Sequence, residues 1–252
     1  MSPFAQLLER HGRATLFFSA GKDSLACLLL MRPFLDRIDV VWCNPGAPHP
    51  AVVSYMDAIR SAVPSFIELK GDQPAWVRKH GWPVDVLPVR STRFGEIGAG
   101  FAPVVFAPYT DCCWANLWAP MRQHLVGTGS TLVIMGQRRE ESMRNRLRDD
   151  GLQEVDGITY WQPINEWPEA AVLGYIKAQG AELPPFYADG ATSSCDCWNC
   201  TAYLDHNIGR LAHMKAAEPE RFAVVGTVLQ ALSMAQQRDI APLHSILENE
   251  HG

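Results

Sequence analysis

The sequence lacks the features that direct a chain into or onto a membrane. It has no run of about 18 apolar residues, the length that a helix needs to span a bilayer. Residues 1–13 lack the charged-then-apolar pattern of a secretory signal. A basic excess is missing too, because the formal net charge is -5, so any contact with nucleic acid must be local. We therefore expect a cytoplasmic protein with no membrane association.

Internal repeats and low-complexity segments are also missing, which excludes solenoids and disordered chains. The 252 residues, 47% of them hydrophobic, are enough to bury a full core. These properties predict one α/β domain with a smaller appended region. We place a nucleotide-binding core at residues 1–164. A C-terminal helical region that packs on it and carries a C-x-x-C pair follows at 165–252.

Apolar segments of strand length alternate with segments of helical period. Such alternation predicts a doubly wound, mainly parallel sheet with ligands at the carboxyl ends of its strands. The expected strands are 15–19, 38–43, 65–69, 131–136 and 158–162, and the expected helices are 2–12, 25–30, 51–63, 116–125 and 168–179. Residues 95–100 read as an exposed flexible loop, and 76–91 have no clear period. Beyond Cys200 the chain is mostly helical, with breaks near Pro219 and Pro242.

A candidate phosphate cradle, Ser19-Ala20-Gly21-Lys22-Asp23-Ser24, lies between the first expected strand and helix. The start of a helix leaves backbone N–H groups unpaired, and these bind anions. Gly21 permits close approach or a positive φ, Lys22 adds a point charge, and the serines add hydroxyl groups. The spacing differs from G-x-x-x-x-G-K-[ST]. A tight turn with a solvated Lys-Asp pair is the alternative.

Four of the seven cysteines form a pattern of metal-site or redox type: adjacent Cys112-Cys113 and, far along the chain, Cys197-Trp198-Asn199-Cys200. Adjacent residues bind one small tetrahedral ion only with strain, whereas a [4Fe–4S] cluster offers separate irons. The pattern therefore favours an iron–sulfur cluster, with structural zinc and a redox dithiol as alternatives. Cys27 and Cys43 lie in apolar runs and are expected in the core.

Several pieces of the chain resemble one enzyme superfamily. The cradle resembles the S-x-G-K-D-S loop of the PP-loop ATP pyrophosphatases, which split ATP between its α and β phosphates. Further pieces resemble, in the same order, the adenylyl-sulfate and phosphoadenylyl-sulfate reductase family: Asp111-Cys112-Cys113, Gly136-Gln137-Arg138-Arg139-Glu140-Glu141-Ser142, Trp161-Gln162-Pro163-Ile164, and Pro185-Phe186-Tyr187-Ala188-Asp189-Gly190 leading into Cys197-Trp198-Asn199-Cys200-Thr201. The resemblance covers roughly residues 14–202. It implies the PP-loop (adenine nucleotide alpha hydrolase-like) fold.

The resemblance also implies a cofactor and a binding site. In the cluster-bearing branch of the family, the matching cysteines hold a [4Fe–4S] cluster, here Cys112, Cys113, Cys197 and Cys200. ATP would place its phosphates on residues 19–24 with Gly136 and Arg138, and its adenosine near Asn44 and Gly46. Mg²⁺ would neutralise the triphosphate. The residues that this implies for the site are Ser19, Ala20, Gly21, Lys22, Asp23, Ser24, Asn44, Gly46, Gly136 and Arg138, of which Lys22, Asp23 and Arg138 would be catalytic.

Three of these assignments have plain structural alternatives. Asp23 either orients Lys22, helps hold Mg²⁺ or is an acid at a helix start. Asn44 and Gly46 either read the nucleotide or form a simple Pro-Gly turn. Three arginines follow the Gly136–Ser142 motif: Arg144, Arg146 and Arg148. They either extend the anion site, contact a nucleic-acid backbone or lie on a solvated face.

Two departures from the reductases carry the functional prediction. Those enzymes attack with a cysteine in a Glu-Cys-Gly-Leu-His tail, yet this chain has no cysteine after Cys200. They also tend to lack the cradle lysine, which is present here as Lys22. Both differences favour an ATP pyrophosphatase similar to those of DNA phosphorothioation.

The predicted reaction is the adenylation of an acceptor for sulfur transfer. An acceptor oxygen attacks the α phosphorus of ATP, pyrophosphate leaves towards Lys22, and the adenylated acceptor takes sulfur carried by the cluster. We expect a nucleic-acid acceptor, with a small molecule as the alternative, and a cysteine desulfurase or other sulfur donor as partner. A homodimer is also considered. One alternative is a sulfonucleotide reductase with a thiol from Cys195 or a partner, and another is a non-catalytic nucleotide sensor.

Overall fold

A six-stranded sheet organises the protein, whose computed structural model describes residues 3–141, 151–188, 191, 194 and 196–248. The strand order is β3 (Phe66–Lys70), β2 (Ile38–Asn44), β1 (Ala14–Phe17), β6 (Leu132–Met135), β8 (Ile158–Trp161) and β7 (Leu152–Val155). Every neighbouring pair is parallel except β7 with β8, which pair antiparallel. The carboxyl ends of β1, β2 and β6 therefore meet at one edge of the sheet.

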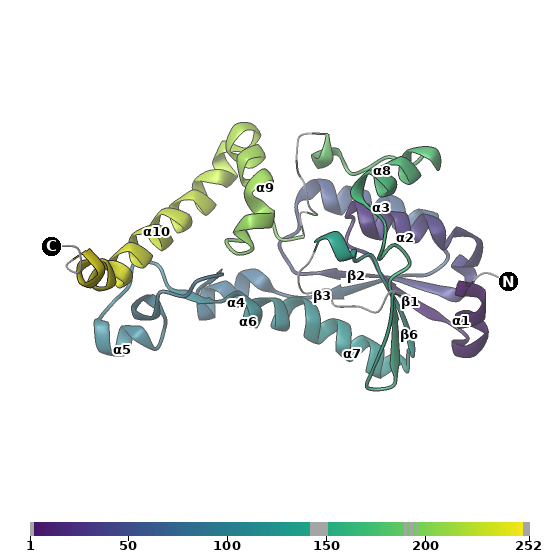
Figure 1. Cartoon of the computed structure of the whole chain (residues 1–252), viewed down its shortest axis with the longest axis horizontal. Coiled ribbons are helices and arrows are strands. Elements are labelled where there is room, and N and C mark those ends of the chain that lie inside the picture. The colour runs from purple at the N-terminus through teal and green to yellow at the C-terminus, as the bar shows by residue number, and fades with distance from the viewer. Residues whose placement is uncertain (1–2, 142–150, 189–190, 192–193, 195, 249–252) are drawn as a thin grey trace.

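Helices cover both faces of this sheet, as expected for a doubly wound fold (Figure 1). The helices α2 (Lys22–Leu30), α3 (Pro50–Ala62) and α8 (Glu169–Ala178) lie on one face, and α7 (Ala119–Thr128) lies on the other. Central strand residues such as Leu16, Val40 and Ile134 are fully buried and form one core with residues of α2, α3 and α8. Burial on both faces is the reason why these strands read as continuous apolar runs. The predicted fold class is confirmed.

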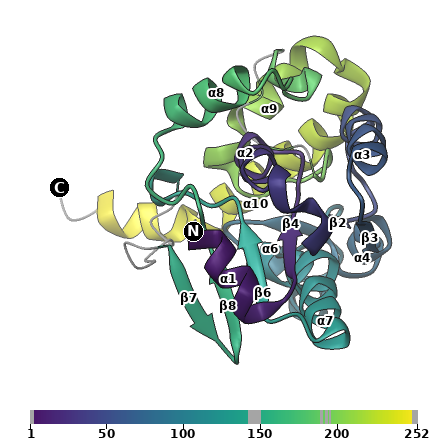
Figure 2. The ribbon, with the colours of Figure 1, turned by 90° about the vertical axis from the view of Figure 1, so that its right-hand side faces the viewer.

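A smaller parallel pair, β4 (Trp82–Val84) with β5 (Phe106–Pro108), lies away from the main sheet and is covered by the C-terminal helices. The last two helices are α9 (Leu204–Ala217) and the long α10 (Pro219–Glu248), which extends away from the main core (Figures 1 and 2). Val228 and Leu232 of α10 pack against Val84 and Phe106. The C-terminal region is therefore attached to the protein through a second apolar cluster.

The remaining elements connect these parts. They are α1 (Pro3–His11), α4 (Gln73–His80), α5 (Gly95–Ala99), α6 (Tyr109–Cys113), a π-helix (Trp114–Trp118), and 3-10 turns at Arg32–Arg37, Val89–Ser91, Arg139–Glu141 and Pro185–Tyr187. None of the described helices combines the length and the apolar composition that a membrane crossing requires. The division at residue 164 stays a prediction, although α8 and the 185–187 turn share the core of the sheet.

Two predicted elements are wrong. Residues 95–100, expected as a flexible loop, contain the short helix α5, which begins beside Thr92, whose hydroxyl accepts from the Gly95 N–H at 2.9 Å. The break expected near Pro242 does not occur, and α10 continues through it. Pro242 lies on an exposed turn, so the carbonyl that it leaves without an intrahelical partner faces water, which lowers the cost. The break at Pro219 is confirmed, since α9 ends at Ala217.

Candidate functional site

The predicted cradle forms the turn between β1 and α2. Ser24 closes the turn, because its hydroxyl donates to the Gly21 carbonyl at 2.9 Å and accepts from the Ser19 N–H at 3.3 Å. The positive φ expected at Gly21 occurs instead at Ala20, with φ of 60°, while Gly21 is extended. Gly21 at the start of α2 has no side chain to cap the helix, so the first N–H groups of α2 can donate to an anion or to an oxygen from another part of the chain.

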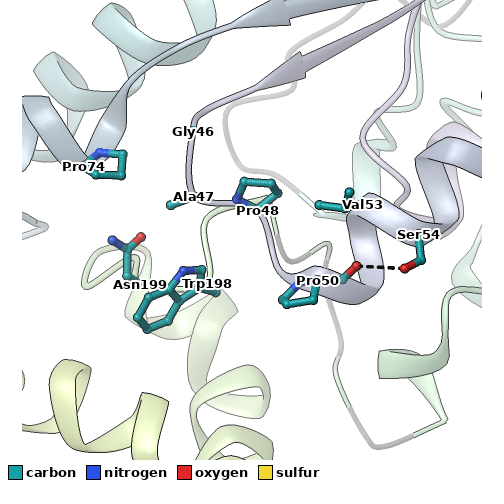
Figure 3. A pocket seen from close by; sticks show the side chains of 9 residues that line it. All are labelled: Gly46, Ala47, Pro48, Pro50, Val53, Ser54, Pro74, Trp198 and Asn199. Carbon is teal, nitrogen blue, oxygen red and sulfur yellow. Dashed lines mark hydrogen bonds between the residues drawn. The ribbon is translucent and has the colours of Figure 1, made fainter.

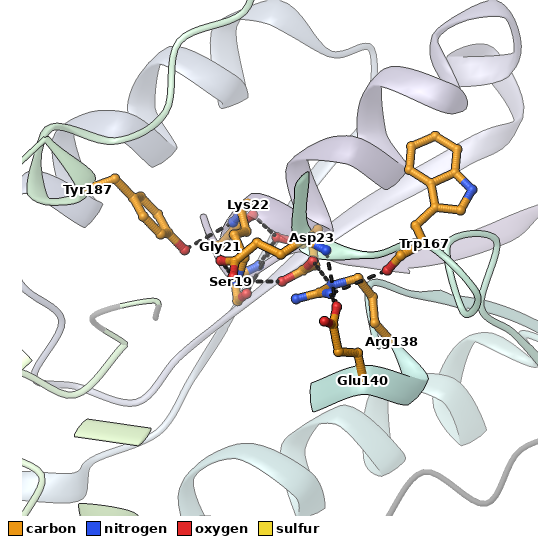
Figure 4. A network of polar contacts seen from close by, with 10 residues as sticks. Ser19, Gly21, Lys22, Asp23, Arg138, Glu140, Trp167 and Tyr187 are labelled. Atoms are coloured by element: carbon orange, nitrogen blue, oxygen red, sulfur yellow. Dashed lines mark hydrogen bonds and ion pairs between the residues drawn. The ribbon is translucent and has the colours of Figure 1, made fainter. Parts of the chain in front are cut away.

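Two buried cations stand beside these N–H groups (Figure 4). Lys22 is 5% exposed, and its Nζ lies 3.2 Å from Asp23 Oδ2 and 3.5 Å from Glu169 Oε1. Arg138, from the loop after β6, is 2% exposed, and its Nε donates to Asp23 Oδ1 at 2.6 Å. Asp23 thus fixes both cations, which favours the orienting role among the three considered for it.

The other carboxylates in this network lie at its solvent side. Glu140 accepts from Arg138 NH1 at 2.8 Å, and the Glu140 and Glu169 side chains are more than half exposed. An exposed carboxylate can turn away at little cost, because it leaves one polar environment for another. Phosphate oxygens can therefore replace both glutamates on Arg138 and Lys22, while the buried Asp23 stays in place.

Tyr187 occupies the anion position of the cradle. Its hydroxyl accepts from the Lys22 backbone N–H at 3.1 Å, and burial raises its pKa to about 12. A Cβ added at Gly21 would lie 3.7 Å from this oxygen and 3.6 Å from Ser194 Cβ, so both residues lie close to the loop. The tyrosine oxygen stands where a phosphate oxygen would accept the same N–H.

The loop after β2 is held by its own polar groups. Asn44 Oδ1 accepts from the Gly46 N–H at 2.9 Å, and Asn44 Nδ2 donates to Glu68 Oε1 at 2.9 Å. Gly46 has a φ of 96°, and a Cβ there would lie 2.9 Å from the Gly71 carbonyl oxygen, so glycine is required. Both the oxygen and the nitrogen of the Asn44 amide therefore hold the loop in its conformation. The loop forms a turn, and it lies where adenosine is predicted to bind.

All four patterned cysteines line one small cavity. Cys112 and Cys113 reach it from the end of α6, and Cys197 and Cys200 reach it from the turn before α9. Burial raises the pKa of Cys112 to about 12, with further contributions from Cys113 and Cys200. Burial also raises the pKa of Cys197 well above its ordinary value. These thiols need a nearby cation, such as iron, to become thiolates at neutral pH.

The four cysteines could supply the donors of a [4Fe–4S] cluster, which takes one thiolate on each of four irons. Within the described ranges, however, no group of three or more His, Cys, Asp or Glu residues is placed to hold a metal ion. Gln73, 1% exposed, also lines the cavity, and its Nε2 donor has no partner among the described residues. Such a donor suits a cluster sulfur or a thiolate.

A family model for the phosphoadenosine phosphosulfate reductase domain matches residues 13–203, which is more than half of the chain. The protein belongs to this family. It is 26% identical to an adenosine 5'-phosphosulfate reductase from Burkholderia cepacia over 205 residues, which are 78% of this chain and 73% of that protein. The predicted resemblance is therefore confirmed at the level of the family.

One solved structure supports the fold, and another is similar over more of the chain. A phosphoadenylyl-sulfate reductase from Candida auris superposes with a TM-score of 0.53 over 75% of this chain and 84% of that chain, at 15% identity. An NH3-dependent NAD synthetase from Campylobacter jejuni matches 92% of this chain and 90% of that chain, with a TM-score of 0.47 and 11% identity. The first of these likenesses shows a shared fold.

The predicted residues fall into two sites. Residues 19–24, Gly136 and Arg138 come together at the carboxyl ends of β1 and β6, whereas the four cysteines line the separate cavity. ATP binding at the first site and cluster binding at the second stay predictions. The assignments on Cys195, Ser142, Arg144, Arg146 and Arg148 lie outside the described residues.

Sequence reasoning gave no role to several residues that the fold brings to these sites. Tyr187 was noted only within a family motif, and Gln73 and Asn199 form an amide pair that joins α4 to the C-x-x-C turn, with Asn199 Nδ2 3.1 Å from Gln73 Oε1. Asp196 is buried beside the cysteines, which raises its pKa to about 6, and its Oδ1 has no partner among the described residues. The one signal in the sequence for these residues was the acid Asp196 directly before the C-x-x-C pair.

Gly136 supports the cradle from β6, and we expect Gly136→Ala to damage it. A Cβ at this position would lie 2.5 Å from the Ser24 N and 2.6 Å from the Asp23 carbonyl carbon, both backbone atoms of α2. The helix start would have to move, so we expect a loss of about 1–3 kcal/mol in the free energy of unfolding and at least about tenfold weaker ATP binding. Urea unfolding and calorimetric ATP titration measure both.

Gly127→Ala is the matched control for this substitution. Gly127 lies inside α7, and a Cβ there meets nothing within 4 Å. Alanine in an open helical position should stabilise the protein by up to about 1 kcal/mol. Equal effects of the two substitutions would contradict the role of Gly136.

Proposed function

We propose that this protein is an ATP pyrophosphatase of the reductase-domain family, which adenylates an acceptor for sulfur transfer. The observation that carries the proposal is the position of Lys22, a buried cation at the start of α2 beside Arg138. Adenylyl sulfate has no β and γ phosphates. A buried cation at the start of α2 is useful to an enzyme that holds and releases pyrophosphate, because the cation stabilises the large negative charge of pyrophosphate.

In the proposed reaction, an acceptor attacks the α phosphorus of ATP in line with the leaving pyrophosphate. The N–H groups at the start of α2 donate to the phosphates after Tyr187 releases the Lys22 N–H, and phosphate oxygens replace Glu140 on Arg138 and Glu169 on Lys22. An acceptor oxygen then forms a bond to the α phosphorus while the bond to the bridging oxygen of the β phosphate breaks. Pyrophosphate leaves towards Lys22. Mg²⁺ would enter with ATP and neutralise part of its charge.

Adenosine would bind near the loop after β2, as the family resemblance implies. Because the Asn44 side chain is engaged within the loop, the contacts to the base and ribose would come from backbone groups around Asn44 and Gly46. The Asx-type turn and the positive φ of Gly46 present these groups at the carboxyl end of the sheet. The side chain of Asn44 thus contributes to the site by shaping it.

The cysteine cavity would supply the sulfur step. Cys112, Cys113, Cys197 and Cys200 would hold a [4Fe–4S] cluster, which when bound carries sulfur or electrons. Sulfur at the oxidation level of sulfide then attacks the activated centre of the acceptor and displaces AMP. A cysteine desulfurase or another sulfur donor would be the partner, and a nucleic acid the acceptor.

A sulfonucleotide reductase is the second candidate. The relative from Burkholderia cepacia is named an adenosine 5'-phosphosulfate reductase, and it aligns with most of this chain. The reducing thiol would then come from Cys195 or a partner protein. A nucleotide sensor without turnover is the third candidate, and tight binding of nucleotide without product would favour it.

Competition binding separates these candidates. Anaerobically purified protein is titrated with labelled ATP, and unlabelled adenylyl sulfate and phosphoadenylyl sulfate compete, while pyrophosphate release is measured in parallel. We expect ATP to bind at least about tenfold more tightly than either sulfonucleotide, because Lys22 contacts only the outer phosphates. Tighter binding of a sulfonucleotide, together with no pyrophosphate release, would replace the proposal with the reductase.

A further inference from the structure

An open pocket lies between the main core and the C-x-x-C turn, and it shares Gly46 with the loop predicted to bind adenosine (Figure 3). Its volume is about 640 Å³, within the range of small-molecule sites. The residues that line it come from the loop after β2, from α3, from α4 and from the turn: Gly46, Ala47, Pro48, Pro50, Val53, Ser54, Pro74, Trp198 and Asn199. No lining residue carries a charge, which suits a neutral planar ligand.

Trp198 gives the pocket an aromatic wall. The backbone N–H of Trp198 donates to the Ala47 carbonyl at 3.1 Å, and Arg210 NH1 donates to the Trp198 carbonyl. The backbone of Trp198 is therefore held on both sides. The Arg221 guanidinium lies 5.9 Å from the ring centroid. A half-buried tryptophan with an arginine beside it is the combination on which nucleobases stack in single-strand binding proteins.

Asn199 adds a polar group to the same pocket. Its side chain is 7% exposed and its Nδ2 donates to Gln73, but its Oδ1 has no partner in the described part of the chain. A buried acceptor without a donor is unfavourable, so a ligand N–H would stabilise it. The exocyclic amino group or ring N–H of a nucleobase provides such a donor.

Basic groups at the rim suit the phosphates attached to a base. Arg221 and His49 contact each other and share Glu218, with His49 Nε2 2.9 Å from Glu218 Oε1. His213 lies 3.8 Å from the same carboxylate, so three basic side chains surround one acid. His49 also caps α3, whose N-terminal dipole favours negative charge near Pro50. The rim thus carries three nitrogen-bearing side chains around one carboxylate.

We propose that this pocket binds a nucleobase, stacked on Trp198 and hydrogen-bonded to Asn199, from a single-stranded nucleic acid or a free nucleotide. Trp198 and Asn199 are the two residues between Cys197 and Cys200, so a base held here stands next to the cysteine cavity. That this base belongs to the acceptor of the reaction rests on the proposed function. The binding itself does not.

Fluorescence anisotropy with a labelled single-stranded 12-nucleotide DNA, in the absence of ATP, tests the pocket. Ser54→Glu places a carboxylate at the pocket, and Ser61→Glu places the same charge elsewhere on α3. Both hydroxyls donate to the carbonyl four residues earlier, so the two substitutions are matched. We expect Ser54→Glu and Trp198→Ala each to weaken binding at least about fivefold, Trp198→Phe to retain most of it, and Ser61→Glu to change nothing.

Competition with unlabelled AMP and CMP distinguishes the source of the base. Displacement at concentrations close to those of the oligonucleotide favours a free nucleotide, and displacement only at much higher concentrations favours a strand with several contacts; both support a base site. Iron content is measured for each Trp198 variant, so that loss of the cysteine site is recognised. Equal binding by Ser54→Glu and Ser61→Glu would overturn the proposal.

A second result would also overturn it, because the proposal concerns a base other than the adenine of the ATP bound at the cradle. If Ser54→Glu weakens ATP binding as much as it weakens oligonucleotide binding, the pocket takes the adenosine of ATP instead of a second base. Pyrophosphate release from ATP by the unsubstituted protein keeps this outcome separate from a failure of the proposed function, because that release is measured without any change at the pocket.

Discussion

Lys22→Met is expected to lower the rate of pyrophosphate release from ATP by about a hundredfold or more. Methionine keeps the length and the apolar stem of the buried lysine and removes only the charge. The cation that neutralises the leaving pyrophosphate is therefore lost, while the N–H groups at the start of α2 remain. Steady-state release, measured with a coupled phosphate assay, gives the rate. Lys22→Arg should recover part of it.

The cradle is expected to survive this substitution. Asp23 keeps its contact with Arg138 at 2.6 Å, so no buried carboxylate is left without a partner. Lys79→Met, on the exposed surface of α4, is the matched control and should leave the rate unchanged. Release by Lys22→Met within a few-fold of the natural protein would contradict the role of Lys22 and, with it, the main support for the pyrophosphatase.

The parts of the fold that the sequence predicts well are those set by local pattern. The strands β1, β2 and β6 are mostly apolar because both faces are largely buried, and the cradle follows from small residues and a lysine between a strand and a helix. The antiparallel β7 was not predicted. Its side chains are mostly exposed and include Gln153 and Glu154, so neither hydrophobic period marks it.

The parts of the site that were not predicted depend on contacts between distant residues. Tyr187 reaches the Lys22 N–H across 165 positions, and Asn199 reaches Gln73 across 126. No local pattern indicates such a contact, because it is decided by how the segment after α8 returns over the sheet. The positive φ of Ala20 was missed for another reason: glycine is the better candidate by propensity, and tertiary contacts at Gly21 decided otherwise.

The cysteine pattern is the one long-range feature that the sequence did indicate. The motif alone does not show whether Cys112-Cys113 and the C-x-x-C pair meet, because the whole segment from α7 to α8 separates them in the sequence. The structure brings all four to one cavity. Asn116, in the π-helix that follows Cys112-Cys113, donates to the Cys112 carbonyl at 2.9 Å and fixes this side of the cavity. What the cavity holds is open to a direct test.

Cys113→Ala and Cys200→Ala are each expected to remove nearly all bound iron from protein reconstituted under anaerobic conditions. A cluster with one thiolate per iron loses a ligand in either case, and the remaining buried thiols have raised pKa values that disfavour their ionisation without the cluster. Iron and sulfide content and the visible absorbance report this independently of activity. The natural protein should bind about four irons per chain.

Cys43→Ala is the control that separates ligation from nearby packing. Cys43 lies close to the same region, with its Sγ 3.5 Å from the Asn116 carbonyl oxygen, but it does not line the cavity. It should therefore keep its full iron content. Zinc bound by the natural protein in place of iron would support a structural ion, and iron retained by Cys113→Ala would exclude Cys113 from ligation. Since adjacent cysteines suit separate irons better than one ion, Cys113 is the decisive position.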